Sequence, residues 1–92
     1  AFADMSDTIV SVRVAGTTYT IELSNTTYLA DNDVVRINNT DYAVTNVDNG
    51  ANTFEIDTGN PETFSNGDLV EWFPFNDRSF KKREPIFLDG MY

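Results

Sequence analysis

The sequence contains neither cysteine nor histidine. Without cysteine, it has no disulfide framework, thiol nucleophile or thiolate ligand for zinc or iron–sulfur clusters. Without histidine, it lacks the commonest general base and the commonest transition-metal ligand, so nothing of that kind activates its serines and threonines. Its two lysines, Lys81 and Lys82, lie in a charged segment, and fifteen acidic residues give carboxylate pairs by chance. We therefore expect no enzyme activity and no cofactor.

Basic residues are scarce, with six Lys and Arg against fifteen Asp and Glu and a net charge of −9. Phosphate binding needs clustered positive charge, so no nucleic-acid partner is expected. The sequence has no apolar run long enough for a transmembrane helix, and residues 1–10 show no signal-peptide pattern. We expect no membrane partner. With 92 residues the chain is one small domain, for which self-association or docking on a larger partner adds buried surface.

Threonine, valine and aromatic residues are frequent, and turn residues recur at short intervals without a helical apolar stripe. This pattern predicts an all-β fold, a small antiparallel barrel or sandwich of the SH3-like kind with about six strands. The expected strands are 8–14, 18–23, 34–38, 41–48, 53–57 and 69–73. The expected inward residues are Val10, Val12, Val14, Tyr19, Ile21, Leu23, Phe54 and Ile56. Asn49-Gly50 predicts a tight hairpin turn.

The sequence repeats itself after 35 residues, because 9–37 aligns without a gap on 44–72 with six identities. Most other positions keep their physical type, as where Tyr19 meets Phe54. The repeat predicts two pseudo-symmetric halves. In it, Leu29 and Phe64 fold over the barrel ends, while Asp33 and Asp68 are turn residues whose carboxylates accept backbone N–H groups.

Two acidic turns, Asp31-Asn32-Asp33 and Asp48-Asn49-Gly50, carry oxygen ligands of the kind that calcium prefers. Neither fits the twelve-residue calcium loop. Asn and Asp also favour such positions for their turn geometry alone, so we expect no metal site.

The last twenty residues differ from the rest, because they hold four of the six basic residues and five of the twelve aromatic ones. We divide the chain into an N-terminal arm (1–7), a β-barrel domain (8–73) and an extended C-terminal arm (74–92). Spaced aromatic anchors around a basic centre suit docking on an acidic surface, although the arm could instead pack on its own barrel. The expected interface residues are Phe75, Arg78, Phe80, Lys81, Lys82, Arg83, Phe87 and Tyr92.

Three runs, 18–23 (TYTIEL), 29–37 (LADNDVVRI) and 64–70 (FSNGDLV), resemble small β-barrel modules of tailed-bacteriophage virions. The likeness covers roughly Ile9–Trp72, and bacterial surface modules and other SH3-like barrels share it. The first copy has Asn32 where that class often has glycine. The resemblance implies a structural role in a virion and carries over no functional residue.

These observations predict a virion structural protein, most simply a capsid decoration or cement protein assembled in the host cytoplasm. Its expected partners are other virion proteins, above all the major capsid protein, and copies of itself, with no small-molecule substrate. A tail, neck or head–tail connector component is an alternative. Another is a carbohydrate-binding or adhesion module, for which Tyr28, Phe64 and Trp72 are the candidate exposed aromatics, although strand alternation places Trp72 inward.

Overall fold

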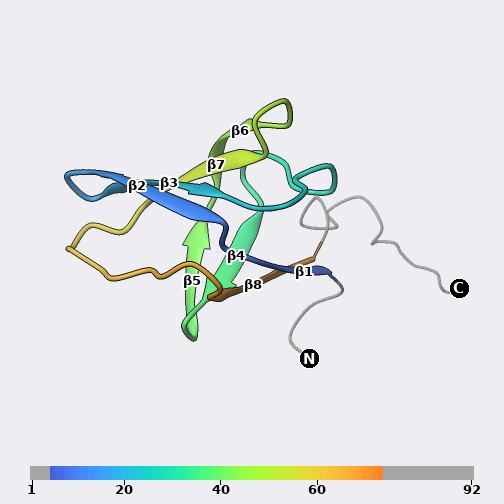
Figure 1. Ribbon diagram of the computed structural model, residues 1–92. Helices are drawn as coiled ribbons and strands as arrows, with labels where there is room; N and C mark the ends of the chain where they lie inside the picture. Colours follow the sequence, from blue (N-terminus) through green and yellow to red (C-terminus); the bar gives the residue numbers. More distant parts are fainter. Residues whose placement is uncertain (1–4, 74–92) are drawn as a thin grey trace, which may run out of the picture.

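The computed structural model describes residues 5–73, which form eight β-strands and no helix. The strands are β1 (Met5–Thr8), β2 (Ser11–Ala15), β3 (Thr18–Glu22), β4 (Val34–Ile37), β5 (Thr40–Ala43), β6 (Thr45–Asp48), β7 (Thr53–Asp57) and β8 (Leu69–Trp72). They build two antiparallel four-stranded sheets, ordered β1-β8-β4-β5 and β2-β3-β7-β6 (Figure 1). The expected small all-β fold is thus confirmed, with eight strands rather than six.

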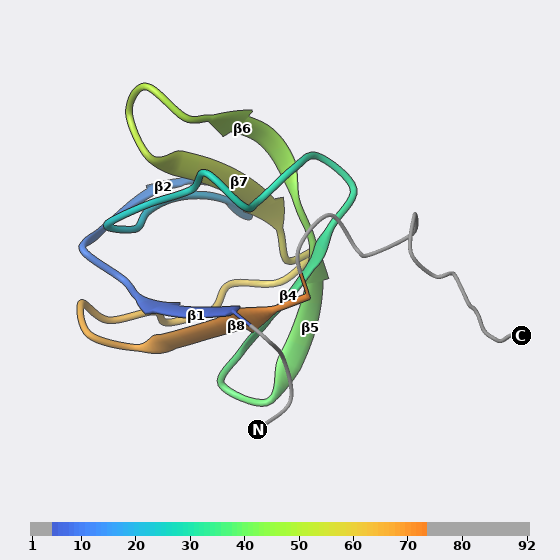
Figure 2. The same ribbon diagram turned by 90° about the vertical axis from the view of Figure 1, so that its right-hand side faces the viewer.

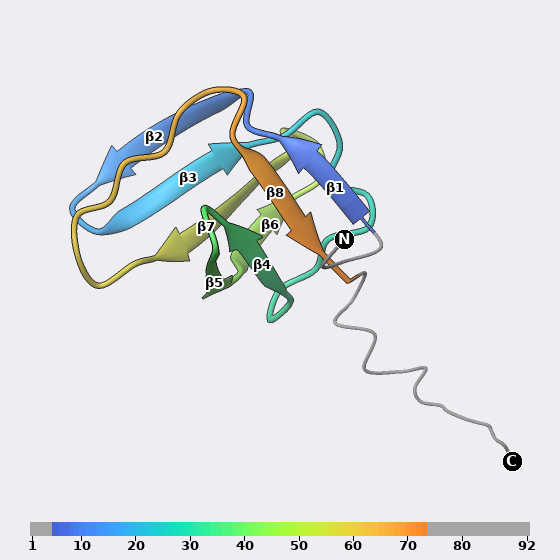
Figure 3. The same cartoon turned by 90° about the horizontal axis from the view of Figure 1, so that it is seen from below.

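The two sheets lie face to face, and β5 runs on into β6 to join one layer to the other (Figure 2). In the view from below, β1 and β8 lie side by side, and the β2–β3 hairpin belongs to the layer behind them (Figure 3). Met5 pairs with Trp72, so both ends of the described chain emerge at the same place.

Two expected strands are each divided between the sheets. The first strand breaks at Ile9 and Val10, and Ile9 is buried there. Of the three valines expected inward, Val12 packs partly buried against the core, but Val10 and Val14 are exposed, so the prediction was wrong for these two. Residues 5–7, assigned to an N-terminal arm, belong to β1. Residues 41–48 likewise break at the buried Val44, which lies between β5 and β6. A short closed structure needs such corners, because a straight strand cannot serve two facing sheets.

The 35-residue repeat is confirmed and reaches further than the sequence predicted. Shifted by 35 residues, β1, β3 and β4 coincide with β5, β7 and β8, and β2 falls on β6 to within two residues at each end. We call Met5–Ile37 the first repeat and Thr40–Trp72 the second repeat. Each repeat buries one corner residue, Ile9 in the first and Val44 in the second. The second and fourth residues of β3 and of β7 are also buried, and they occupy equivalent positions in the two repeats.

The pairing register gives the repeats a pseudo-two-fold relation. Thr20 pairs with Glu55 and Arg36 with Glu71, so each of these residues faces its own equivalent 35 positions away. Loop hydrogen bonds repeat as well. The N–H of Leu23 donates to the carbonyl oxygen of Asn52 at 2.9 Å, and the equivalent N–H of Thr58 donates to that of Thr17 at 3.0 Å.

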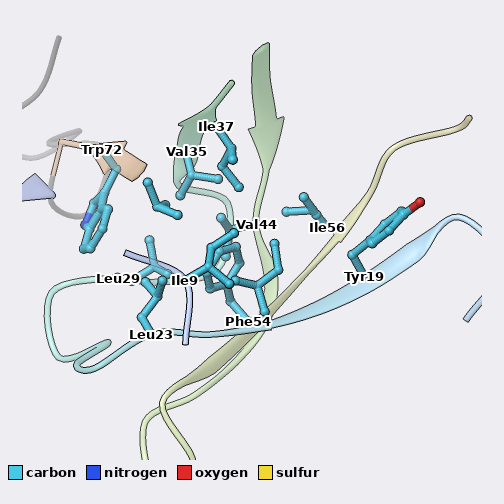
Figure 4. Close-up of a cluster of buried hydrophobic side chains, with 12 residues drawn as sticks. Ile9, Tyr19, Leu23, Leu29, Val35, Ile37, Val44, Phe54, Ile56 and Trp72 are labelled. Atoms are coloured by element: carbon cyan, nitrogen blue, oxygen red, sulfur yellow. The ribbon is translucent and has the colours of Figure 1, made fainter. Parts of the chain in front are cut away.

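The core lies between the sheets and contains twelve buried hydrophobic residues (Figure 4). They are Ile9, Tyr19, Ile21, Leu23, Leu29, Val35, Ile37, Val44, Phe54, Ile56, Val70 and Trp72. Each fully buried aliphatic or aromatic side chain of this size contributes about 1.5–3 kcal/mol to folding. The expected inward positions of β3 and β7 are confirmed. Leu29 is buried and Phe64 packs partly buried against the same core, as the repeat predicted.

Candidate docking surface

All eight residues expected to form the partner interface, Phe75, Arg78, Phe80, Lys81, Lys82, Arg83, Phe87 and Tyr92, lie outside the described residues. What the structure places is the surface beside the point where that segment begins. Strand β8 ends at Trp72, and Phe73 is the last described residue. The neighbouring surface is the outer face of the β1-β8-β4-β5 sheet.

An apolar row crosses this face at the end of β8. Val34 lies opposite Ala43 on β5, and Val35 lies opposite Trp72 on β8. One further step of that register places Phe73 beside Val34. Phe73 is 41% and Val34 38% exposed, and Ala43 is also exposed. Phe73, Val34 and Ala43, which we call the apolar row, therefore present hydrophobic surface to solvent directly beside the start of residues 74–92.

A charged row lies next to the apolar row. Arg36 pairs across the strands with Glu71 on one side and Asp41 on the other. Its guanidinium donates to the Asp41 carboxylate at 2.8 and 3.3 Å. This hydrogen bond lowers the pKa of Asp41 and, with the nearby charge of Glu71, raises the pKa of Arg36. In residues 5–73 this is the one ion pair, among eleven acidic and two basic residues.

The aromatic residues considered for sugar binding do not form one exposed surface. Trp72 is buried and donates its indole N–H to the carbonyl oxygen of Tyr28 at 2.9 Å. Phe64 packs edge-on against Tyr19 and Tyr42, with ring centroids 5.0 and 5.8 Å apart. Tyr28 alone of the three candidates is largely exposed, at 51%. The expected inward position of Trp72 is confirmed.

The acidic turns use their carboxylates as backbone acceptors. Asp48 Oδ1 accepts the N–H groups of Gly50 and Ala51, and Asp31 Oδ1 accepts the N–H of Val47. Asp33 accepts the N–H of Ala30, as the repeat predicted. Within the described range, no three acidic side chains gather as a metal site would require. These aspartates therefore have a structural task that accounts for their positions.

The part of the chain described by the structure forms no pocket. It also contains no helix of the length and apolar character needed to cross a bilayer. No family model, curated protein or solved structure matches the chain.

The sequence did not single out Val34 and Phe73 as neighbours. Alternation along each strand does place both outward, since Val35 and Trp72 are inward. Their juxtaposition depends on the register between β4 and β8, two strands that are far apart in sequence. The repeat alone does not fix this register, because some equivalent strands pair, such as β4 with β8, whereas β1 and β5 do not.

Proposed function

We propose that the chain is a non-enzymatic structural protein of a tailed-phage virion, a capsid decoration protein that docks on the capsid lattice through residues 74–92. The observation that carries this proposal is the apolar row beside the start of that aromatic and basic segment. Phe73 and Val34 would continue the anchor series that starts at Phe75 and form one apolar contact with a neighbouring protein.

Charge supports the same reading. Residues 1–72 carry twelve acidic and two basic residues, whereas residues 73–92 carry three acidic and four basic ones. An acidic globule keeps free subunits soluble and apart, and a basic segment steers toward an acidic lattice. A tail or neck component would use the same docking chemistry, so the place of the protein in the particle has to be measured.

The direct test is mass spectrometry of virions released by cells that encode the chain, after purification on a density gradient. We expect its peptides in a fixed ratio to the major capsid protein. Emptied heads separated from tails should retain it, and recovery with tails would favour the tail or neck alternative. Absence from intact particles would refute the virion proposal.

The repeat provides a matched pair of variants for the docking surface. Val34 and Leu69 are equivalent first residues of β4 and β8, and both are exposed, but only Val34 lies in the apolar row. We expect Val34→Glu and deletion of residues 79–92 each to reduce the amount bound to particles at least tenfold. Leu69→Glu should bind as the unmodified chain does. Equal binding by all variants would show that this surface and segment are not the attachment site.

A further inference from the structure

Most of the strand pairing among the described residues joins the first repeat to the second repeat. In one sheet the ladders β1–β8, β8–β4 and β4–β5 all join the first repeat to the second, and in the other sheet β3–β7 does so. Among the described strands, pairing within a repeat is limited to the hairpins β2–β3 and β6–β7. A two-stranded hairpin is marginally stable in water, so each repeat needs a complementary repeat to fold.

The two repeats are joined by Asn38 and Asn39 alone. Both have left-handed backbones, with φ values of +53° and +65°. A two-residue hairpin turn of type I′ requires this conformation at both positions, and Asn-Gly satisfies it better than Asn-Asn, because only glycine adopts it without a steric cost. Short hinge loops held in such a conformation favour exchange of the elements on either side between copies.

The register of the β4–β5 ladder continues through this hinge without a slip. Val34 pairs with Ala43 and Ile37 with Thr40, so the next step pairs residue 38 with residue 39. If the turn opens, residues 34–43 of one copy can pair along their whole length with residues 34–43 of a second copy. Every pairing between repeats is kept, and residue 38 of each copy can now pair with residue 39 of the other.

We propose that the interface between repeats is also an interaction surface for a second copy of this chain, and that two copies exchange their second repeats by opening at Asn38-Asn39. Each globule of the exchanged dimer contains the first repeat of one copy and the second repeat of the other. The dimer carries two copies of residues 74–92, and linked binding segments gain avidity. The exchange does not depend on the virion proposal, since it rests on strand pairing and the hinge alone.

The absence of cysteine makes exchange directly measurable. Thr20 in the first repeat lies opposite Glu55 in the second, which is a suitable arrangement for an engineered disulfide. In the double variant Thr20→Cys/Glu55→Cys, the disulfide joins one chain to itself in the monomer and joins two chains in the exchanged dimer. A non-reducing gel separates the two products. After refolding at a concentration on the order of a millimolar, comparable with the effective concentration of a short linker, we expect both products. After refolding at high dilution, we expect the intrachain product alone.

Two changes at the hinge, each made in the double-cysteine variant, should shift the balance between the intrachain and the interchain disulfide in opposite directions. Asn38→Pro/Asn39→Pro cannot form the left-handed turn, because proline fixes φ near −65°. The prolines have no N–H and give up the additional pairing at the hinge, but the β4–β5 pairs on either side remain. We therefore expect the interchain product to become the main one at every concentration. Asn39→Gly favours the turn, and it should reduce the interchain share several-fold relative to the unmodified hinge. Exclusively intrachain disulfide in the proline variant, or its failure to fold at any concentration, would overturn the proposal, since the exchanged dimer needs no left-handed residue there. An equal share of interchain disulfide in the unmodified hinge, the proline variant and Asn39→Gly would also overturn the proposal, because random crosslinking between chains would give that result.

Discussion

The phenol oxygen of Tyr19 makes two hydrogen bonds to the backbone of Glu62, donating to its carbonyl oxygen at 2.8 Å and accepting from its N–H at 2.7 Å. The ring is buried on β3 and packs edge-on against Phe64. One core side chain thus fixes the long connection between β7 and β8. The aligned residue of the second repeat, Phe54, has no hydroxyl, so this anchor belongs to one repeat only.

We expect Tyr19→Phe to lower the free energy of unfolding by about 1 kcal/mol, because it removes both hydrogen bonds while keeping the ring packed. Tyr28→Phe is the matched control, since the same hydroxyl is removed from a side chain that is 51% exposed. That change should stay within about 0.5 kcal/mol. Urea denaturation of the two variants measures the difference. Equal effects would mean that the Glu62 contacts contribute no net stability.

Asp33 and Asp68 occupy equivalent positions but differ in burial. Each carboxylate accepts a backbone N–H three residues earlier, from Ala30 at 3.0 Å and from Ser65 at 2.9 Å. Asp33 is fully buried, whereas Asp68 is partly exposed. An N–H without a partner is costly only where water cannot replace the carboxylate. We therefore expect Asp33→Ala to cost about 1–3 kcal/mol and Asp68→Ala less than about 1 kcal/mol. Equal losses in thermal or urea unfolding would contradict this assignment.

The sequence predicted the parts of the fold that depend on local alternation and on the repeat. Tyr19, Ile21 and Phe54 are inward as expected, because alternate residues of a half-buried strand face the core. The corners at Ile9 and Val44 were not predicted, since a continuous run of strand-forming residues does not indicate where a strand changes sheets. The tight hairpin turn predicted at Asn49-Gly50 is instead a four-residue loop, 49–52, in which Asn52 rather than Gly50 has a left-handed backbone.

The candidate surface was the least predictable feature for the same reason. Its composition was visible, but which exposed residues are neighbours depends on pairing between distant strands. The register between β4 and β8 decides that Val34 lies beside Phe73, and neither strand alone contains that information. The eight proposed anchor residues after Pro74 remain predictions from composition and spacing.

The Arg36–Asp41 pair makes a contribution to the stability of the fold that depends on pH, and its direction follows from the lowered pKa of Asp41. The hydrogen bond from Arg36 holds the pKa of Asp41 below its ordinary value of 3.8 in the folded protein. A carboxyl with a depressed folded-state pKa stabilises the fold above its ordinary pKa, and that contribution is lost as pH falls through the lowered value. We expect Arg36→Gln to return the pKa of Asp41 toward 3.8, as followed by NMR titration of the carboxyl carbon. Arg13→Gln, on the other sheet, should leave it unchanged. A pKa unaffected by Arg36→Gln would show that the pair does not persist in solution.

Asn32 and Gly67 are equivalent residues with left-handed backbones, at φ +75° and +93°. A Cβ at Gly67 would meet no atom within 4 Å, so any cost of a side chain there is conformational rather than steric crowding. We expect Gly67→Ala to destabilise the fold by about 1–2 kcal/mol, and Gly67→Asn to cost clearly less, because Asn tolerates this region. The reciprocal change Asn32→Gly should be close to neutral. Thermal unfolding of the three variants tests the order. A Gly67→Asn variant as unstable as Gly67→Ala would mean that the second repeat does not accept the residue used at the same turn of the first.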